Sequence, residues 1–172
     1  MNCFILDTNP WKCATYIDDV RLPKMIVESA QMMASGLRKA GLTDEDFIEY
    51  GILTKADQPY RGAYKHHPVT IWVGLNHSNY SWHRDMAISM LNEYTTRFGK
   101  IHACEEPIKR MAQLWNRIPY GEMTPFAQAM PDEYKDEDAV KAYRAYYQSK
   151  AYSKGGVRYV RTSYPDWWGA AV

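Results

Sequence analysis

The sequence lacks the features that mark secreted and membrane-spanning proteins. It has only three cysteines among 172 residues and no C-x-x-C pair, which argues against a disulfide scaffold and a thiolate zinc site. No stretch approaches the ~20 consecutive apolar residues of a membrane span. The opening Met-Asn-Cys-Phe-Ile-Leu-Asp has no basic segment ahead of a leader-like apolar run. We therefore expect a cytoplasmic protein with no membrane partner.

Several catalytic signatures are also missing. The sequence contains no glycine-rich phosphate loop, no G-x-S-x-G elbow and no Cys–His motif. Its five histidines do not form an H-E-x-x-H or similar metal signature. These absences argue against P-loop nucleotide chemistry, and we expect neither a metal nor a bound cofactor.

The net charge is small, but the charges are unevenly distributed along the chain. The net charge of +1 excludes an overall basic, histone-like binder, yet the last 33 residues carry six Lys or Arg and one acid. The same segment, 140–172, holds eight of the 24 aromatic residues. Cations that hold phosphates and rings that stack on bases suit nucleic acid. The alternative is an aromatic tail packed on the core. The candidate nucleic-acid contacts are Lys65, Arg144, Lys150, Lys154, Arg158, Arg161, Trp167 and Trp168.

The spacing of apolar residues, prolines and glycines predicts one mainly α domain over 1–172, with at most a short N-terminal strand at 2–6. We expect helices over 10–17, 23–40, 44–50, 68–98, 105–117 and 137–151. The long helix has a possible bend near Gly74. Segments 51–67 and 118–136 are rich in Pro or Gly and are expected to be loops.

The helix over 23–40 is the most informative segment. One face is apolar, while a narrow polar stripe on the opposite face carries Lys24, Glu28, Gln31 and Ser35. An exposed helix usually has a wide polar face, so the narrow stripe predicts the lining of a polar cleft in which Lys24 and Glu28 pair. The alternative is an ordinary solvated stripe. Residues just before the helix add candidate carboxylates and a cation at the mouth: Asp18, Asp19 and Arg21.

A second cluster begins at Tyr64, Lys65 and His67. On the helix that follows, one stripe with +4, +3, +4 spacing combines a ring, two amides and an imidazole: Trp72, Asn76, Asn79 and His83. Such a stripe is suited to stacking a base and bonding its edge. The alternative is a capping His67 and a buried Trp72. We take Gln31, Tyr64, His67 and the four stripe residues as candidate substrate-binding residues.

Three segments together resemble a known family. Tyr16 to Lys24, with Arg21-Leu22-Pro23-Lys24, resembles a segment of the phage pyrimidine dimer DNA glycosylases of the endonuclease V type. His67-Pro68-Val69-Thr70-Ile71-Trp72 and its long helix look like that family's central helix, and the aromatic, basic tail is similar in character. The chain also resembles a set of small uncharacterised phage proteins. The resemblance implies an all-α fold that kinks double-stranded DNA and flips a nucleotide.

The resemblance also implies an amine nucleophile. In the family a free N-terminal α-amine forms a Schiff base with deoxyribose, which here points to Met1. The family's catalytic Glu falls at Arg21, so Asp19 or Glu28 must supply the carboxylate that glycosidic cleavage needs. The candidate catalytic residues are Met1, Asp19, Arg21, Lys24 and Glu28.

The function expected from these observations is a DNA-processing enzyme that acts on an extruded pyrimidine, glycosylase- or lyase-like. Two alternatives stay open. One is a transferase that modifies a thymine or cytosine derivative in phage DNA, and the other is a non-catalytic nucleic-acid- or protein-binding phage factor. If the protein is phage-encoded, its expected location is the host cytoplasm.

Overall fold

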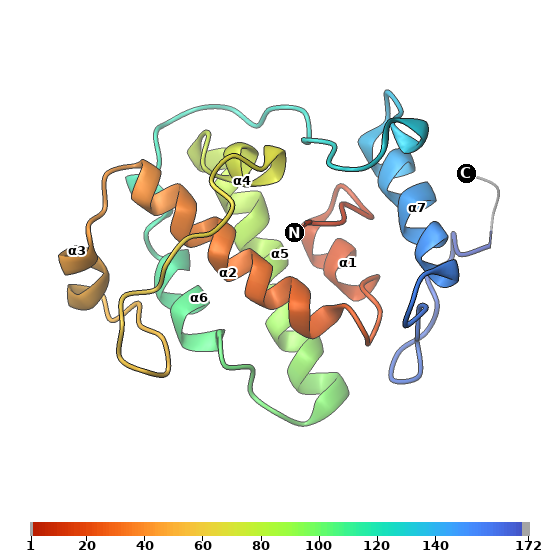
Figure 1. The fold of residues 1–172 in the computed structure, drawn as a ribbon, viewed down its shortest axis with the longest axis horizontal. Helices are drawn as coiled ribbons and strands as arrows, with labels where there is room; N and C mark the ends of the chain where they lie inside the picture. Colours follow the sequence, from red (N-terminus) through yellow and green to blue (C-terminus); the bar gives the residue numbers. More distant parts are fainter. Residues whose placement is uncertain (1, 170–172) are drawn as a thin grey trace.

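The computed structural model describes residues 2–169 and is built almost wholly of helices (Figure 1). The described residues form seven α-helices, three short 3-10 helices (η1 to η3) and one isolated bridge, Leu53 to Pro59, with no sheet. The mainly α fold expected from the sequence is confirmed. The helices are α1 Pro10–Thr15, α2 Leu22–Lys39, α3 Asp44–Glu49, α4 Pro68–Val73, α5 His77–Phe98, α6 Glu105–Ala112 and α7 Ala139–Ser149. The 3-10 helices are η1 Trp115–Arg117, η2 Asp132–Tyr134 and η3 Lys150–Tyr152.

Helix α2 is the central element, and it packs on α4, α5 and α6. The apolar face expected from its spacing is fully buried: Ile26, Ala30, Met33 and Leu37 are 0% exposed. Burying four such side chains supplies several kcal/mol, at roughly 25 cal/mol per Å² of apolar surface. The polar stripe on the opposite face of α2 therefore points away from this apolar core. Lys24 and Glu28 belong to that stripe and line the surface cleft described below.

The helix ends follow the expected local chemistry. Asn9, Thr43 and Asp138 accept main-chain N–H groups at the starts of α1, α3 and α7, and Thr43 forms a capping box with Asp46. Gly99 ends α5 in the left-handed conformation at φ 63°. Each of these caps depends only on residues that are close to it in the sequence.

The expected single helix over 68–98 is wrong. The segment forms two helices, because α4 ends at Val73 and Asn76 caps the start of α5. The break lies where α4 meets α2: a Cβ added at Gly74 would stand 2.9 Å from Cα of Gly36. Two glycines let the backbones approach this closely. The approach is a tertiary contact, which helical periodicity does not report.

Two other boundaries differ from expectation. The helix expected over 105–117 ends at Ala112 and is followed by η1. Residues 2–6 form no strand; Cys3 to Leu6 are buried as an extended segment inside the helical body. That segment brings Asn2 against the middle of α2, which matters for the site.

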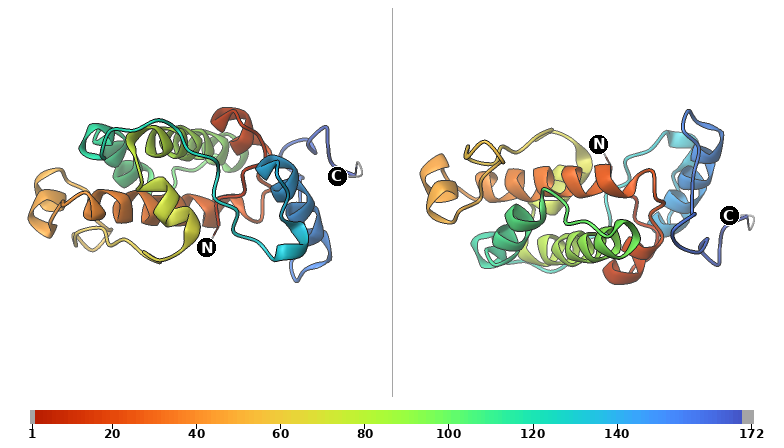
Figure 2. Two further views of the ribbon diagram at one scale, coloured as in Figure 1. Left: turned by 90° about the horizontal axis from the view of Figure 1, so that it is seen from above. Right: turned by 90° about the horizontal axis from the view of Figure 1, so that it is seen from below.

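The C-terminal segment lies at one end of the molecule, with α7 far from α3 (Figures 1 and 2). The loop 118–136 runs along an edge of the helical body and leads to α7. Side chains rather than helix packing attach α7: the Tyr143 hydroxyl donates to the carbonyl of Ala127, and Tyr147 donates to Asp18. In the described part of the chain, no helix is both long and apolar enough to cross a membrane.

Candidate functional site

A polar cleft of about 250 Å³ lies where α2, the N-terminal segment and the C-terminal end of α7 meet. Three segments far apart in the sequence contribute its walls. The residues that line it are Asn2, Phe4, Arg21, Lys24, Met25, Glu28, Tyr146 and Lys150. We call it the Glu28 cleft. The predicted polar cleft on α2 is thus present, and it contains three of the candidate catalytic residues.

Glu28 is the acid of the cleft. The residue is only 6% exposed, and its Oε2 accepts the main-chain N–H of Asn2 at 2.6 Å. Its Oε1 lies 3.5 Å from Nζ of Lys24, one helical turn earlier. The predicted pairing of Lys24 with Glu28 is confirmed. A buried carboxylate held by a charge-assisted hydrogen bond is fixed in position, which a catalytic group requires.

Three cations line the cleft together with this carboxylate. The side chain of Lys24 is 73% exposed and reaches out over the cleft. Lys150 lies over the ring of Tyr146, with Nζ 3.7 Å from the ring centroid. Arg21 donates to Asp18 and to the carbonyl of Gly156. Counting Asp18, which pairs with Arg21, three cations stand against two acids, and this net positive charge suits an anion.

The other candidate residues on this side lie outside the cleft. Gln31 lines a second hollow of about 300 Å³. His67 caps α4 by accepting the N–H of Val69; partial burial lowers its pKa, and the charge of Glu28 opposes that shift. Tyr64 is 66% exposed and has φ 53°. Met1 lies outside the described residues.

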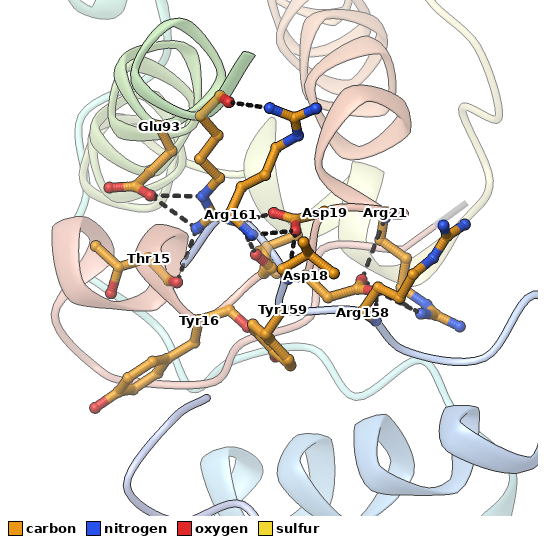
Figure 3. A network of polar contacts seen from close by, with 12 residues as sticks. Thr15, Tyr16, Asp18, Asp19, Arg21, Glu93, Arg158, Tyr159 and Arg161 are labelled. Carbon is orange, nitrogen blue, oxygen red and sulfur yellow. Dashed lines mark hydrogen bonds and ion pairs between the residues drawn. The ribbon is translucent and has the colours of Figure 1, made fainter. Parts of the chain in front are cut away.

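Asp19 does not line the Glu28 cleft. Its Oδ2 accepts the main-chain N–H groups of Val160 and Arg161, both at 2.9 Å, and its Oδ1 lies 3.4 Å from Arg97 (Figure 3). Arg97 also pairs with Glu93. The neighbouring Asp18 is fully buried and accepts from Tyr147 and from the N–H of Arg158. Both aspartates therefore anchor the C-terminal segment to the α1–α2 turn.

Much of the basic tail is occupied by contacts within the protein. Arg144 donates to the carbonyl of Leu6, and Arg161 donates to the carbonyl of Arg97. The rings of Trp167 and Trp168 pack edge-on or tilted against Tyr16, Tyr147 and Tyr159. For Trp167 and Trp168 the structure thus agrees with the alternative stated above, an aromatic tail packed on the core. The side chains of Lys154 and Arg158 belong to exposed residues and Lys150 lines the cleft, so these three cations remain placed for a ligand.

The Trp72 stripe is buried in the fold. Asn79, 0% exposed, donates to the carbonyl of Trp72 and to Thr124, and accepts the N–H of Thr124. Asn76 donates to the carbonyl of Glu122. These groups fasten the loop 118–136 to the helices, because buried amides must be hydrogen-bonded. Because these side chains are buried, they do not form an exposed face that could contact a base.

His83 is also 0% exposed. Its Nδ1 lies 3.3 Å from the thiol of Cys3, and burial lowers its pKa to about 4. Burial raises the pKa of the Cys3 thiol. The pair is therefore neutral and belongs to the core below Glu28. Among residues 2–169, no group of three or more His, Cys, Asp or Glu is arranged to hold a metal ion.

Sequence reasoning missed Asn2, Phe4 and Tyr146 as cleft residues. Asn2 and Phe4 are adjacent to no recognisable motif, and Tyr146 was counted only as part of an aromatic tail. The only sequence signal for these residues was the narrow polar stripe of α2. It implies that another segment completes the cleft opposite the helix, but it does not identify that segment.

Comparison of the chain with protein-family models, with curated proteins and with solved structures finds no match. The function is accordingly argued from the cleft itself.

Proposed function

We propose that the protein is a DNA glycosylase/lyase that acts on a pyrimidine nucleotide extruded from double-stranded DNA into the Glu28 cleft. The observation that carries the proposal is a nearly buried carboxylate, Glu28, 3.5 Å from a primary amine, Lys24, in a cleft that two further cations, Arg21 and Lys150, also line. A carboxylate and an amine are the two groups that amine-dependent cleavage of a glycosidic bond needs.

The roles follow from the geometry. Glu28 accepts a proton from the ammonium of Lys24, which leaves a nucleophilic amine. The amine attacks C1′ of the deoxyribose, the C1′–N bond breaks, and the departing base takes the proton that Glu28 had accepted. Opening of the sugar ring gives an iminium that links Lys24 to the strand. The proton that the nitrogen loses in this ring opening goes to O4′. Glu28, ionised again once the base has taken its proton, lies beside the positive charge of the iminium and stabilises it.

The remaining cleft residues bind and orient the nucleotide. Arg21 and Lys150 both line the cleft and supply positive charge for the phosphates on either side of the extruded nucleotide. Tyr146 and Phe4 offer aromatic surface to the base. Extrusion costs a few kcal/mol, which these contacts must offset.

The test is borohydride trapping on ultraviolet-irradiated and undamaged duplexes in parallel. Borohydride reduces the iminium to a stable amine, so the proposal predicts a covalent protein–DNA band on irradiated DNA only. Glu28→Gln is expected to lose the band, whereas Glu137→Gln, an exposed acid on the C-terminal segment, is expected to keep it. The absence of a band and of a nick with the unaltered protein would overturn the proposal. Nucleoside mass spectrometry would then look for a modified base.

A further inference from the structure

A third hollow along α2 is larger than the Glu28 cleft and has no role in the proposed reaction. It encloses about 600 Å³ between the C-terminal half of α2, the loop 52–67 and α4. Among the residues that line it are Ser35, Arg38, Lys39, Lys65, His66 and Ile71. We call it the Lys65 pocket.

The pocket is rich in cationic groups. No carboxylate lines it, while Arg38, Lys39 and Lys65 each bring a positive charge. Arg38 is partly committed, since it pairs with Asp44 at 2.7 Å and donates to the carbonyl of Tyr60. Lys39 and Lys65 have no ion-pair partner among the described residues and are both exposed. Unpaired lysines around a hollow attract an anion.

The loop is held in the shape that makes the pocket. Gly62 presses on α2 so closely that a Cβ added there would lie 2.8 Å from Cα of Ser35. The Ser35 hydroxyl donates to the carbonyl of Ala63. Tyr64 then adopts a positive φ, and the turn closes with the N–H of His67 on the carbonyl of Tyr64 at 2.8 Å. This turn carries Lys65 and His66, so both are presented from a fixed backbone.

The pocket lies in line with the Glu28 cleft. Glu28, Gln31 and Ser35 each line a different hollow along the polar stripe of α2. The ten residue steps from Glu28 to Arg38 span about 15 Å at 1.5 Å per residue, which is the rise of about four base pairs at 3.4 Å each. A strand with its reacting nucleotide at Glu28 therefore reaches the Lys65 pocket within a few nucleotides.

We infer that the Lys65 pocket binds the phosphodiester backbone of the DNA strand that flanks the extruded nucleotide, with Lys39 and Lys65 as the phosphate contacts. The exposed Ile71 offers apolar surface to a sugar or base. A free nucleotide is the other source of the same chemistry. The backbone is favoured because the cations stand at an exposed rim, whereas small-molecule sites bury most of their ligand. This inference rests on the proposed function.

The test is the salt dependence of binding to a short duplex, measured by fluorescence anisotropy. Each phosphate contact adds about 0.9 to the steepness with which the log of the binding constant falls against the log of the salt concentration. Lys39→Gln/Lys65→Gln is therefore expected to make this negative slope shallower by about 2. The matched control is Lys55→Gln/Lys100→Gln, which removes the same charge from exposed lysines outside the pocket. The control is expected to leave the slope within about 0.5 of the original.

The outcomes separate the two proposals. An unchanged slope in Lys39→Gln/Lys65→Gln, or an equal loss in the control, overturns the pocket assignment even if borohydride trapping succeeds. A selective loss of slope without trapping supports the pocket and overturns the glycosylase. In a parallel titration with thymidine 5′-monophosphate, binding that the double variant abolishes while the DNA slope stays unchanged would assign the pocket to a free nucleotide. That result too overturns the inference.

Discussion

The main-chain N–H of Asn2 donates to Oε2 of Glu28 across 2.6 Å and joins the N-terminal segment to the middle of α2. This bond does two things at once. It compensates part of the cost of burying a carboxylate, and it leaves Oε1 facing Lys24 and the open cleft. A structural hydrogen bond thus orients the group to which we assign the chemistry.

The identity of the amine is tested at Lys24. Lys24→Arg keeps the positive charge but replaces the amine with a guanidinium, which is not deprotonated in proteins. We expect the borohydride-trapped product to fall by roughly 100-fold or more, while duplex affinity changes by less than about 3-fold, equivalent to roughly 0.7 kcal/mol. A trapped band of undiminished intensity in Lys24→Arg would transfer the nucleophile to another amine, with the α-amine of Met1 the first to examine.

Asp19 is expected to matter for stability rather than for turnover. Asp19→Asn weakens two charge-assisted hydrogen bonds to the C-terminal segment and the ion pair with Arg97 (Figure 3). We expect a loss of about 1–3 kcal/mol in the free energy of unfolding, measured by urea denaturation. Activity per folded molecule should change little. If turnover collapsed at unchanged stability, Asp19 would return to the list of catalytic residues.

Asn79 provides a test of the buried stripe. Asn79→Ala removes the hydrogen bonds to the hydroxyl and N–H of Thr124 and one of the bonds to the carbonyl of Trp72, which keeps the N–H of Leu75. Unsatisfied buried groups cost about 1–3 kcal/mol each, so the unfolding midpoint in urea should fall clearly. DNA affinity of the folded variant, measured by anisotropy well below that midpoint, should stay unchanged. A selective loss of DNA affinity would instead favour a base-reading role for this residue.

The stability of the protein should fall as the pH drops from about 6.5 to about 4. Burial lowers the pKa of His83 from 6.5 to about 4 in the folded state, so the unfolded chain binds the proton more readily within that window. The contribution is fully present above pH 6.5 and is lost toward pH 4, by at most about 3 kcal/mol. Urea denaturation across this range measures it. His83→Gln should show a shallower pH dependence, and an identical pH dependence in both proteins would contradict this assignment.

The sequence by itself was sufficient for the local features. The helix starts at Pro10 and Asp44, the end of α5 at Phe98 and the buried face of α2 depend on residues within one or two turns of each other, and all were predicted. The Lys24–Glu28 pair was predicted for the same reason, since helix geometry places i and i+4 on one face.

Only the tertiary structure decided which candidate residues share a site. Trp72, Asn79 and His83 have the helical spacing of a binding face, but the break at Gly74 and the packing of the loop 118–136 bury them. Asp19 and Glu28 look alike as acids near one helix start. One anchors the tail and the other lines the cleft, because the segments that meet them, 158–161 and Asn2, come from opposite ends of the chain. Such long-range contacts reflect the summed burial of the whole chain, which no local pattern encodes.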